Sequence, residues 1–95
     1  MITTKQRAVL RKLVHTLDPA VYIGKNGLTE SVLKEMELAL DAHELVKVKV
    51  QDNCLEDLRS LAHASAEQIG AEVVQVIGRK FSLYRPSEKK LIVLK

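Results

Sequence analysis

Two hydrophobic periodicities alternate along these 95 residues and limit the folds that are open to the chain. Apolar residues recur at helical spacing in three segments, whereas Leu45–Val50 alternates with the period of two that marks a strand with one buried face. Strands that alternate with helices pair in parallel through right-handed crossovers, and two closing strands add an antiparallel pair. The sequence therefore predicts an α+β fold of order α-β-α-β-α-β-β, a four-stranded mixed sheet layered with helices. The predicted helices span 4–16, 29–43 and 53–69, and the predicted strands span 20–23, 45–50, 72–77 and 80–85.

Local signals refine the boundaries and the strand positions. The third helix is predicted to start at a capping box, because Asn53 is followed three residues later by Glu56. Strand 72–77 carries valine and isoleucine on both alternating faces, which is typical of an interior strand. Gly78 begins the tight connection from that strand to the next.

Composition and motifs exclude several classes of protein. Cys54 is the only cysteine, so it is interpreted as a structural thiol, and a disulfide or cysteine-rich metal site cannot form within the chain. The longest apolar runs are four residues, too short to span a membrane. His15, His43 and His63 have no evident nucleophile or carboxylate partner, and the common hydrolase and metalloprotease motifs are missing. We expect one domain over 1–95, cytoplasmic, monomeric and non-enzymatic, with no cofactor, metal or small-molecule substrate.

Charge is divided into three blocks along the chain. Residues 1–29 have a net charge of +4, residues 30–75 of −6 and residues 76–95 of +5. If the fold brings the two ends together, one face becomes cationic and attracts a polyanion, and the opposite face becomes anionic. The alternative is that the charges are scattered over an ordinary surface.

A glycine tetrad joins the first predicted strand to the second helix. Gly24 and Gly27 allow unusual backbone dihedrals, Asn26 tolerates a positive φ, and Lys25 adds a cation. The amides at a helix N-terminus suit an anion. Taken alone, a G-x-x-G tetrad fits a plain turn as well as a phosphate clamp, and the flanking basic blocks favour the clamp.

Basic residues outside the tetrad widen the candidate site. Lys47 and Lys49 are left open, because the strand that holds them does not show which of its faces is covered. If the polyanion is a nucleic acid, Tyr22, Phe81 and Tyr84 could stack on its bases, but core packing is favoured for each. The further candidates for contact with the polyanion are Lys5, Arg7, Arg11 and Lys12 in the first helix and Arg79, Lys80 and Arg85 in the closing hairpin.

Four sequence motifs resemble the CRM domain, named for chloroplast RNA splicing and ribosome maturation, in its bacterial stand-alone YhbY-like form. The resemblance covers about 4–86 and leaves 87–95 as a C-terminal tail. The motifs are GKxGLT at 24–29, HELxKxK at 43–49, GR at 78–79 and YRP at 84–86.

This resemblance implies a fold like the C-terminal domain of translation initiation factor three. It also implies RNA binding through the G-x-x-G loop and the neighbouring basic surface, and association with precursors of the large ribosomal subunit. The chain would then be a non-enzymatic ribosome assembly factor. The alternative function is a protein–protein adaptor that uses the acidic middle block and the apolar tail.

Overall fold

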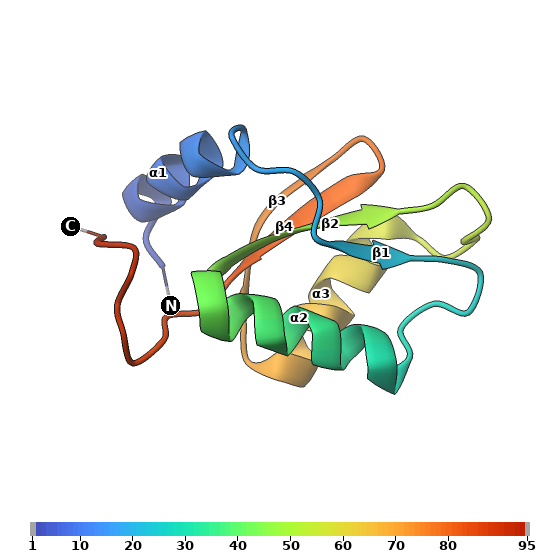
Figure 1. Ribbon diagram of the computed structural model, residues 1–95. Coiled ribbons are helices and arrows are strands. Elements are labelled where there is room, and N and C mark those ends of the chain that lie inside the picture. The colour runs from blue at the N-terminus through green and yellow to red at the C-terminus, as the bar shows by residue number, and fades with distance from the viewer. Residues whose placement is uncertain (1, 95) are drawn as a thin grey trace.

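The computed structural model describes residues 2–94 and contains the seven elements in the predicted order (Figure 1). The α+β fold class is confirmed. Its four-stranded mixed sheet has the strand order β1-β2-β4-β3. The elements are α1 (Thr4–Val14), β1 (Val21–Ile23), α2 (Glu30–His43), β2 (Leu45–Val50), α3 (Leu58–Ile69), β3 (Glu72–Ile77) and β4 (Lys80–Tyr84).

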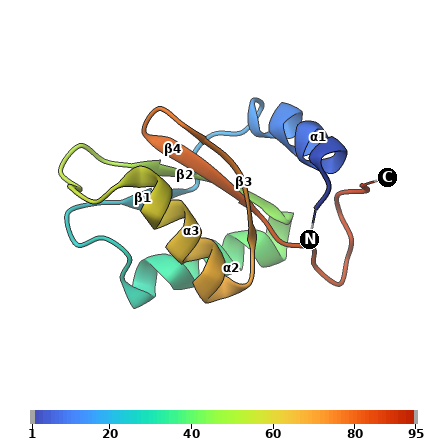
Figure 2. The same ribbon diagram turned by 180° about the vertical axis from the view of Figure 1, so that it is seen from behind.

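The sheet is covered on both faces, but unequally. Strand β1 pairs in parallel with β2, and β4 pairs antiparallel with both β2 and β3. Helices α2 and α3 lie on one face, while α1 crosses the other, as the two opposite views show (Figures 1 and 2). The sheet therefore has one fully layered face and one face that a single short helix covers in part.

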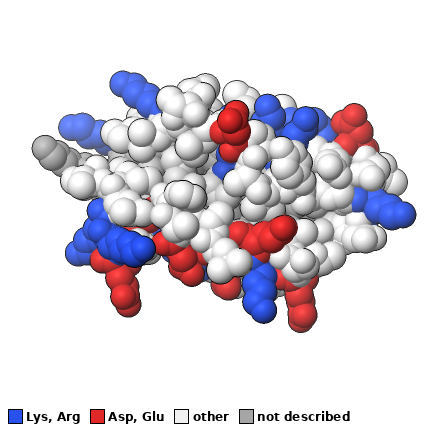
Figure 3. Space-filling view, viewed as in Figure 1, with Lys and Arg blue, Asp and Glu red and all other residues white. Residues whose placement is uncertain are grey.

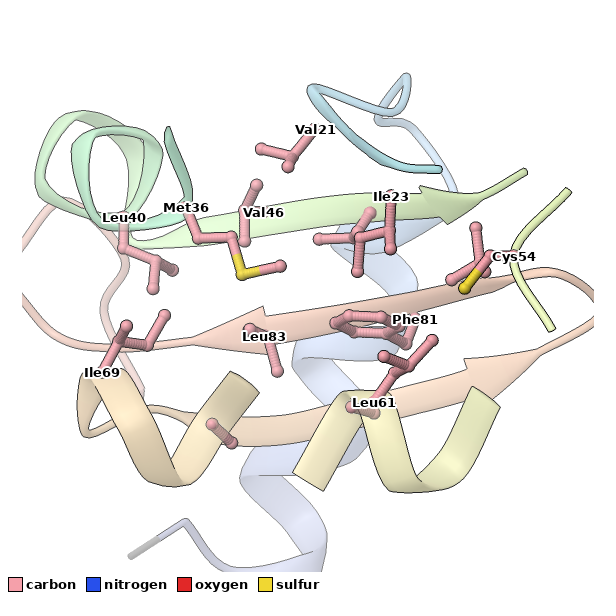
Figure 4. Packing of buried hydrophobic residues seen from close by; sticks show 14 residues of the cluster. Val21, Ile23, Met36, Leu40, Val46, Cys54, Leu61, Ile69, Phe81 and Leu83 are labelled. Atoms are coloured by element: carbon pink, nitrogen blue, oxygen red, sulfur yellow. The ribbon is translucent and has the colours of Figure 1, made fainter. Parts of the chain in front are cut away.

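The main core lies between the sheet and the helices α2 and α3 (Figure 4). Val21, Val48 and Phe81 sit side by side on three neighbouring strands, since the register pairs Val21 with Val48 and Val48 with Phe81. Phe81 is the largest fully buried side chain of the described residues. The helices contribute Met36, Leu40, Leu61, Ala62, Ala66 and Ile69, and the buried thiol of Cys54 completes the cluster.

A second, smaller core holds α1 and the C-terminal tail on the opposite face. Leu10 and Val14 of α1 pack on Leu45, Val74 and Tyr84 of the sheet. Ile92 and Leu94 pack against the same cluster, so the tail docks on this end of the sheet and adds no strand within the described residues. Half of the apolar tail is thus used inside the molecule, while Leu91 and Val93 remain exposed.

The start of α3 differs from the predicted capping box. Asp57, not Asn53, is the N-cap, and its side chain accepts the Ser60 backbone N–H at 3.0 Å. These hydrogen bonds from the backbone and hydroxyl of Ser60 lower the pKa of Asp57. The prediction was wrong because residues 51–56 form a loop, in which the Cys54 backbone N–H donates to the Gln51 carbonyl.

Strand β3 is an edge strand, so its prediction as an interior strand was also wrong. It is apolar on both faces because α3 covers one face and α1 the other. A register shift between Val73 and Gln75 directs the Val74 side chain toward the second core, whereas Val73 and Val76 pack against the main core. Ile77, at the end of the strand, is 61% exposed. Apolar residues on both faces of a strand therefore indicate that helices cover both faces, and do not indicate how many strands lie beside it.

Candidate nucleic-acid interface

Three loops meet at one end of the sheet. The parallel strands β1 and β2 both finish there, followed by loops 24–29 and 51–57. Strand β4 runs the other way, so the β3–β4 turn at 78–79 lies at the same end, with Lys49 beside Lys80. The topology therefore brings the glycine tetrad to the same end of the sheet as the basic turn, with β2 and its following loop between them, although more than fifty residues separate the two in the sequence.

The glycine tetrad forms a hydrogen-bonded turn. The Gly27 backbone N–H donates to the Gly24 carbonyl at 3.0 Å, and Gly27 has a φ of 66°. Lys25 and Asn26 form the exposed tip, and within residues 2–94 their backbone N–H groups have no acceptor. Thr29 then caps α2 by accepting the Val32 N–H at 3.1 Å. The tip thus presents two unpaired donors and one cation beside a helix N-terminus.

Gly27 has a structural reason to be glycine that requires no ligand, because its φ of 66° is strained for an L-residue. A Cβ at Gly27 would also displace the Glu56 carboxylate, and a Cβ at Gly24 would lie 3.0 Å from Oε1 of Gln51, which is the movable end of a side chain. Gly27 is itself buried beneath that carboxylate. Glycine therefore shapes this turn, while contact with a ligand is left to Lys25 and Asn26. The exposed Glu56 carboxylate beside the turn opposes the approach of an anion.

Arg79 joins the β3–β4 turn to the loop after β2. Its Nη2 donates to the carbonyls of Gln51 and Cys54, at 2.9 and 3.2 Å. The side chain is exposed, and a guanidinium has five N–H donors, so the remaining donors can meet a ligand. Arg79 thus fixes the loop and still offers charge at the same end of the sheet.

The question of which sheet face holds Lys47 and Lys49 is answered by the position of α1. Lys47 Nζ donates to the carbonyls of Val14 and Leu17, at 3.4 and 3.2 Å, and so caps the C-terminal end of α1. Lys49 points to the same face one pair further along β2 and is exposed. The α1 face is therefore covered as far as Lys47 and open beyond it.

The three aromatic side chains have different surroundings. Phe81 and Tyr84 are buried, as predicted. Burial raises the pKa of the Tyr84 hydroxyl, and the charge of Glu44 adds to this effect. Tyr22 is 49% exposed, so its prediction as a core residue was wrong. The reason is strand alternation, because Val21 and Ile23 face the main core and Tyr22 faces away from it.

The four basic residues of α1 are divided between two sides of the helix. Lys5 and Lys12 are exposed and form no hydrogen bond or ion pair within the described residues. Arg7 and Arg11 line a groove of about 600 Å³ along β3, and Arg7 also donates to the Val73 carbonyl. This groove continues to Gln75 and Ile77, which also line a second groove beside the β3–β4 turn.

The sequence-based reasoning missed two members of the groove along β3. Arg59 and His63 of α3 line it opposite Arg7 and Arg11. Their spacing of four places them on one helix face, which is the available sequence signal. Using that signal requires the knowledge that β3 lies at the sheet edge between α1 and α3.

Arg85 lies elsewhere and serves the fold. Its Nη2 donates to Asp41 at 2.8 Å and its Nη1 to the Ile69 carbonyl at 2.6 Å, with Glu37 at 3.8 Å. It follows β4 at the end of the sheet opposite the glycine turn. The geometry therefore separates Arg85 from the other candidates, because its charge is already matched by carboxylates of α2.

Charge is unevenly distributed over the visible face of the molecule (Figure 3). Many Lys and Arg lie along the upper edge, over α1 and the β2–β4 side, where acidic side chains interrupt them, and most Asp and Glu lie along the lower edge over the helical layer. Some basic side chains also occur along the lower edge. No group of three His, Cys, Asp or Glu that could hold a metal ion is found among residues 2–94. No helix of the described chain is long and apolar enough to cross a membrane.

The family of the chain is shown by comparison with known proteins. Residues 2–85 match the model of the CRS1 / YhbY (CRM) domain, and the chain belongs to this family. The match ends at Arg85, so the whole tail of 87–95, which docks on the second core through Ile92 and Leu94, lies beyond it.

Individual relatives cover nearly the whole chain. An RNA-binding protein of Haemophilus influenzae is 46% identical over 98% of this chain and 94% of its own length. Bacillus subtilis YqeI, named as a probable RNA-binding protein, is 38% identical over 94% of this chain and 93% of its own. The solution structure of Staphylococcus aureus SAV1595 superposes with a TM-score of 0.84 at 42% identity and covers both chains fully.

Proposed function

We propose that this protein binds RNA through the backbone of the nucleic acid and assists assembly of the large ribosomal subunit without catalysing a reaction. The observation that carries the proposal is the exposed Lys25–Asn26 tip, with two unpaired backbone N–H groups and a cation. Phosphate oxygens accept hydrogen bonds from such groups, and these contacts position a protein on RNA without reading its sequence.

A basic path continues from the glycine turn and supports the same ligand. Lys49, Lys80 and Arg79 lie at the same end of the sheet, and two grooves sharing Gln75 and Ile77 lead from there to Arg7 and Arg11. A polyanion laid along this path would meet cations at several points, so its affinity should fall steeply with salt. Lys5 and Lys12 would flank the path, and Arg85 is left out because its charge is already paired.

The choice of ribosomal RNA rests on the family resemblance, since phosphate contacts alone do not select one RNA. We further propose, following the expectations drawn from the sequence, a single non-enzymatic domain that works in the cytoplasm as a monomer. The adaptor alternative loses support from the geometry, because Ile92 and Leu94 pack inside the molecule and Asp41 pairs with Arg85.

Crosslinking in cells followed by sequencing of the bound RNA tests this function. The wild-type protein should enrich precursors of large-subunit RNA, and Lys25→Gln should reduce that enrichment. Lys34→Gln, which removes an exposed lysine from α2, is the matched control and should leave the enrichment unchanged. Recovery of messenger or other RNA in proportion to its abundance would contradict the ribosomal role.

A further inference from the structure

An exposed tyrosine and two lysines form a row across the open part of the sheet. The register pairs Tyr22 of β1 with Lys49 of β2, and Lys49 with Lys80 of β4, so all three side chains lie on the face away from the main core. Neighbouring strands lie about 4.8 Å apart, so the row brings an aromatic ring and two cations within the span of one or two nucleotides.

The backbone of Tyr22 is held in place, but no helix packs over its ring within the described residues. Val21 and Ile23 on either side of it are buried in the main core, which leaves β1 little freedom to rotate. Helix α1 ends before it reaches this row. Lys47, two residues before Lys49 on β2, already caps the carbonyls at the C-terminal end of that helix. A half-exposed aromatic ring on a rigid strand offers a flat apolar surface at low entropic cost.

The charges around the Tyr22 ring indicate which kind of ligand fits this surface. Lys47, Lys49 and Lys80 are the charged residues that the register places on this part of the face. Among the described strand residues, Glu72 is the only carboxylate turned to this face, and it lies at the covered end, paired in register with Tyr84. A groove of about 350 Å³ beside the row adds His15 and Arg79. An apolar ring surrounded by cations matches a nucleotide, which combines a stacking face with a phosphate.

We propose that Tyr22 stacks on an unpaired base of single-stranded RNA, while Lys49 and Lys80 contact the phosphates on either side of it. Gly24 follows Tyr22 by two residues, so the same strand would present a base platform and lead into the backbone-binding turn. This inference rests on the proposed RNA binding and adds the type of RNA. Bases inside an A-form duplex cannot reach a sheet surface, whereas unpaired bases stack on such aromatic platforms.

Fluorescence anisotropy with a labelled 12-nucleotide oligouridine and a labelled 12-base-pair RNA duplex tests the inference. Tyr22→Ala should weaken oligouridine binding by roughly 5- to 150-fold, since stacking of a base on an aromatic ring contributes about 1–3 kcal/mol. Tyr22→Phe keeps the ring and should bind oligouridine within about twofold of wild type. Leu38→Ala on α2 removes a 66% exposed side chain from the other side of the molecule and should have no effect.

The two claims fail in different ways. If wild-type protein binds oligouridine and Tyr22→Ala binds it within twofold, Tyr22 is not a stacking platform, and the proposed RNA binding remains. Equal loss of duplex and single-strand binding in Tyr22→Ala would also overturn the platform. If wild-type protein binds neither RNA at low salt, the proposed function and the inference both fail.

Discussion

The carboxylate of Glu44 accepts two hydrogen bonds from Ser87, from its backbone N–H and from its hydroxyl, each 2.6 Å long. The other carboxylate oxygen accepts the Ile92 N–H at 2.7 Å. Glu44 is fully buried and caps α2 with a φ of 65°. Burial alone would raise the pKa of Glu44, but the hydrogen bonds from Ser87 and the Ile92 backbone outweigh it and lower that pKa to about 2. One buried side chain therefore ties the end of α2 to the C-terminal tail.

Replacing Glu44 with glutamine should release the tail. A glutamine side chain keeps one acceptor oxygen, but an NH₂ group replaces the second carboxylate oxygen. That NH₂ group would face N–H or O–H donors and could not accept their hydrogen bonds. The free energy of unfolding, measured with urea, should fall by about 3 kcal/mol. Glu35→Gln changes the same charge on the surface of α2 and should stay within about 0.5 kcal/mol of wild type. Equal stability of the two variants would contradict the role of Glu44.

The low pKa of Glu44 also predicts an acid-sensitive contribution to stability. The pKa falls from 4.5 to about 2 on folding, so this contribution is fully present above pH 4.5 and is lost as the pH falls toward 2. Urea unfolding of wild type should therefore weaken more steeply between pH 4.5 and 2 than unfolding of Glu44→Gln. Parallel pH profiles for the two proteins would show that folding does not lower the pKa of Glu44.

The carboxylate of Glu56 should reduce RNA affinity, because it lies against Gly27 beside the proposed phosphate site. Glu56→Gln removes this charge and should raise RNA affinity roughly two- to fivefold at low salt, with the gain shrinking as salt screens the charge. Glu67→Gln makes the same change near the end of α3, away from the turn, and should have a smaller effect. Anisotropy titrations at two salt concentrations measure both. A weaker complex for Glu56→Gln would show that its carboxylate shapes the turn.

Gly27 and Gly70 form a matched pair for separating strain from binding. Both have a φ of 66°, but Gly70 caps α3 and a Cβ there meets nothing within 4 Å. Alanine at either position should cost about 1–2 kcal/mol of stability through backbone strain, and at Gly27 the Glu56 side chain must also move aside. Only Gly27→Ala should also weaken RNA binding, since only it distorts the proposed phosphate turn. Equal RNA affinities of the two variants would remove the turn from the site.

The order of elements could be predicted because hydrophobic periodicity and helix caps are local. The place of each strand within the sheet could not be predicted from local patterns. Strand β3 is apolar on both faces because it contacts α1 and α3, which lie far apart in the sequence. The capping signal at Asn53 was outweighed by Arg79, which holds the carbonyls of Gln51 and Cys54 in a loop. Local patterns thus define elements, whereas tertiary contacts decide edges and loop ends.

The candidate site was predictable only where residues that are neighbours in the sequence form it. The glycine turn was recognised because its strand and helix flank it directly in the sequence. Arg85 looked equivalent to Arg79, but its partner Asp41 becomes a neighbour only after folding. Tyr22 could have been assigned to the outer face from the alternation of Val21 and Ile23, yet nothing local shows that α1 stops short of it.

The salt dependence of RNA binding by Lys25→Gln tests the central claim most directly. Each phosphate contact made with single-stranded RNA contributes about 0.7 to the slope of log affinity against log salt. Lys25→Gln should lower the magnitude of that slope by about 0.7 and weaken binding to RNAs of different sequence alike, whereas Lys34→Gln should match wild type. An unchanged slope and affinity for Lys25→Gln would contradict a phosphate-binding turn at Gly24–Gly27.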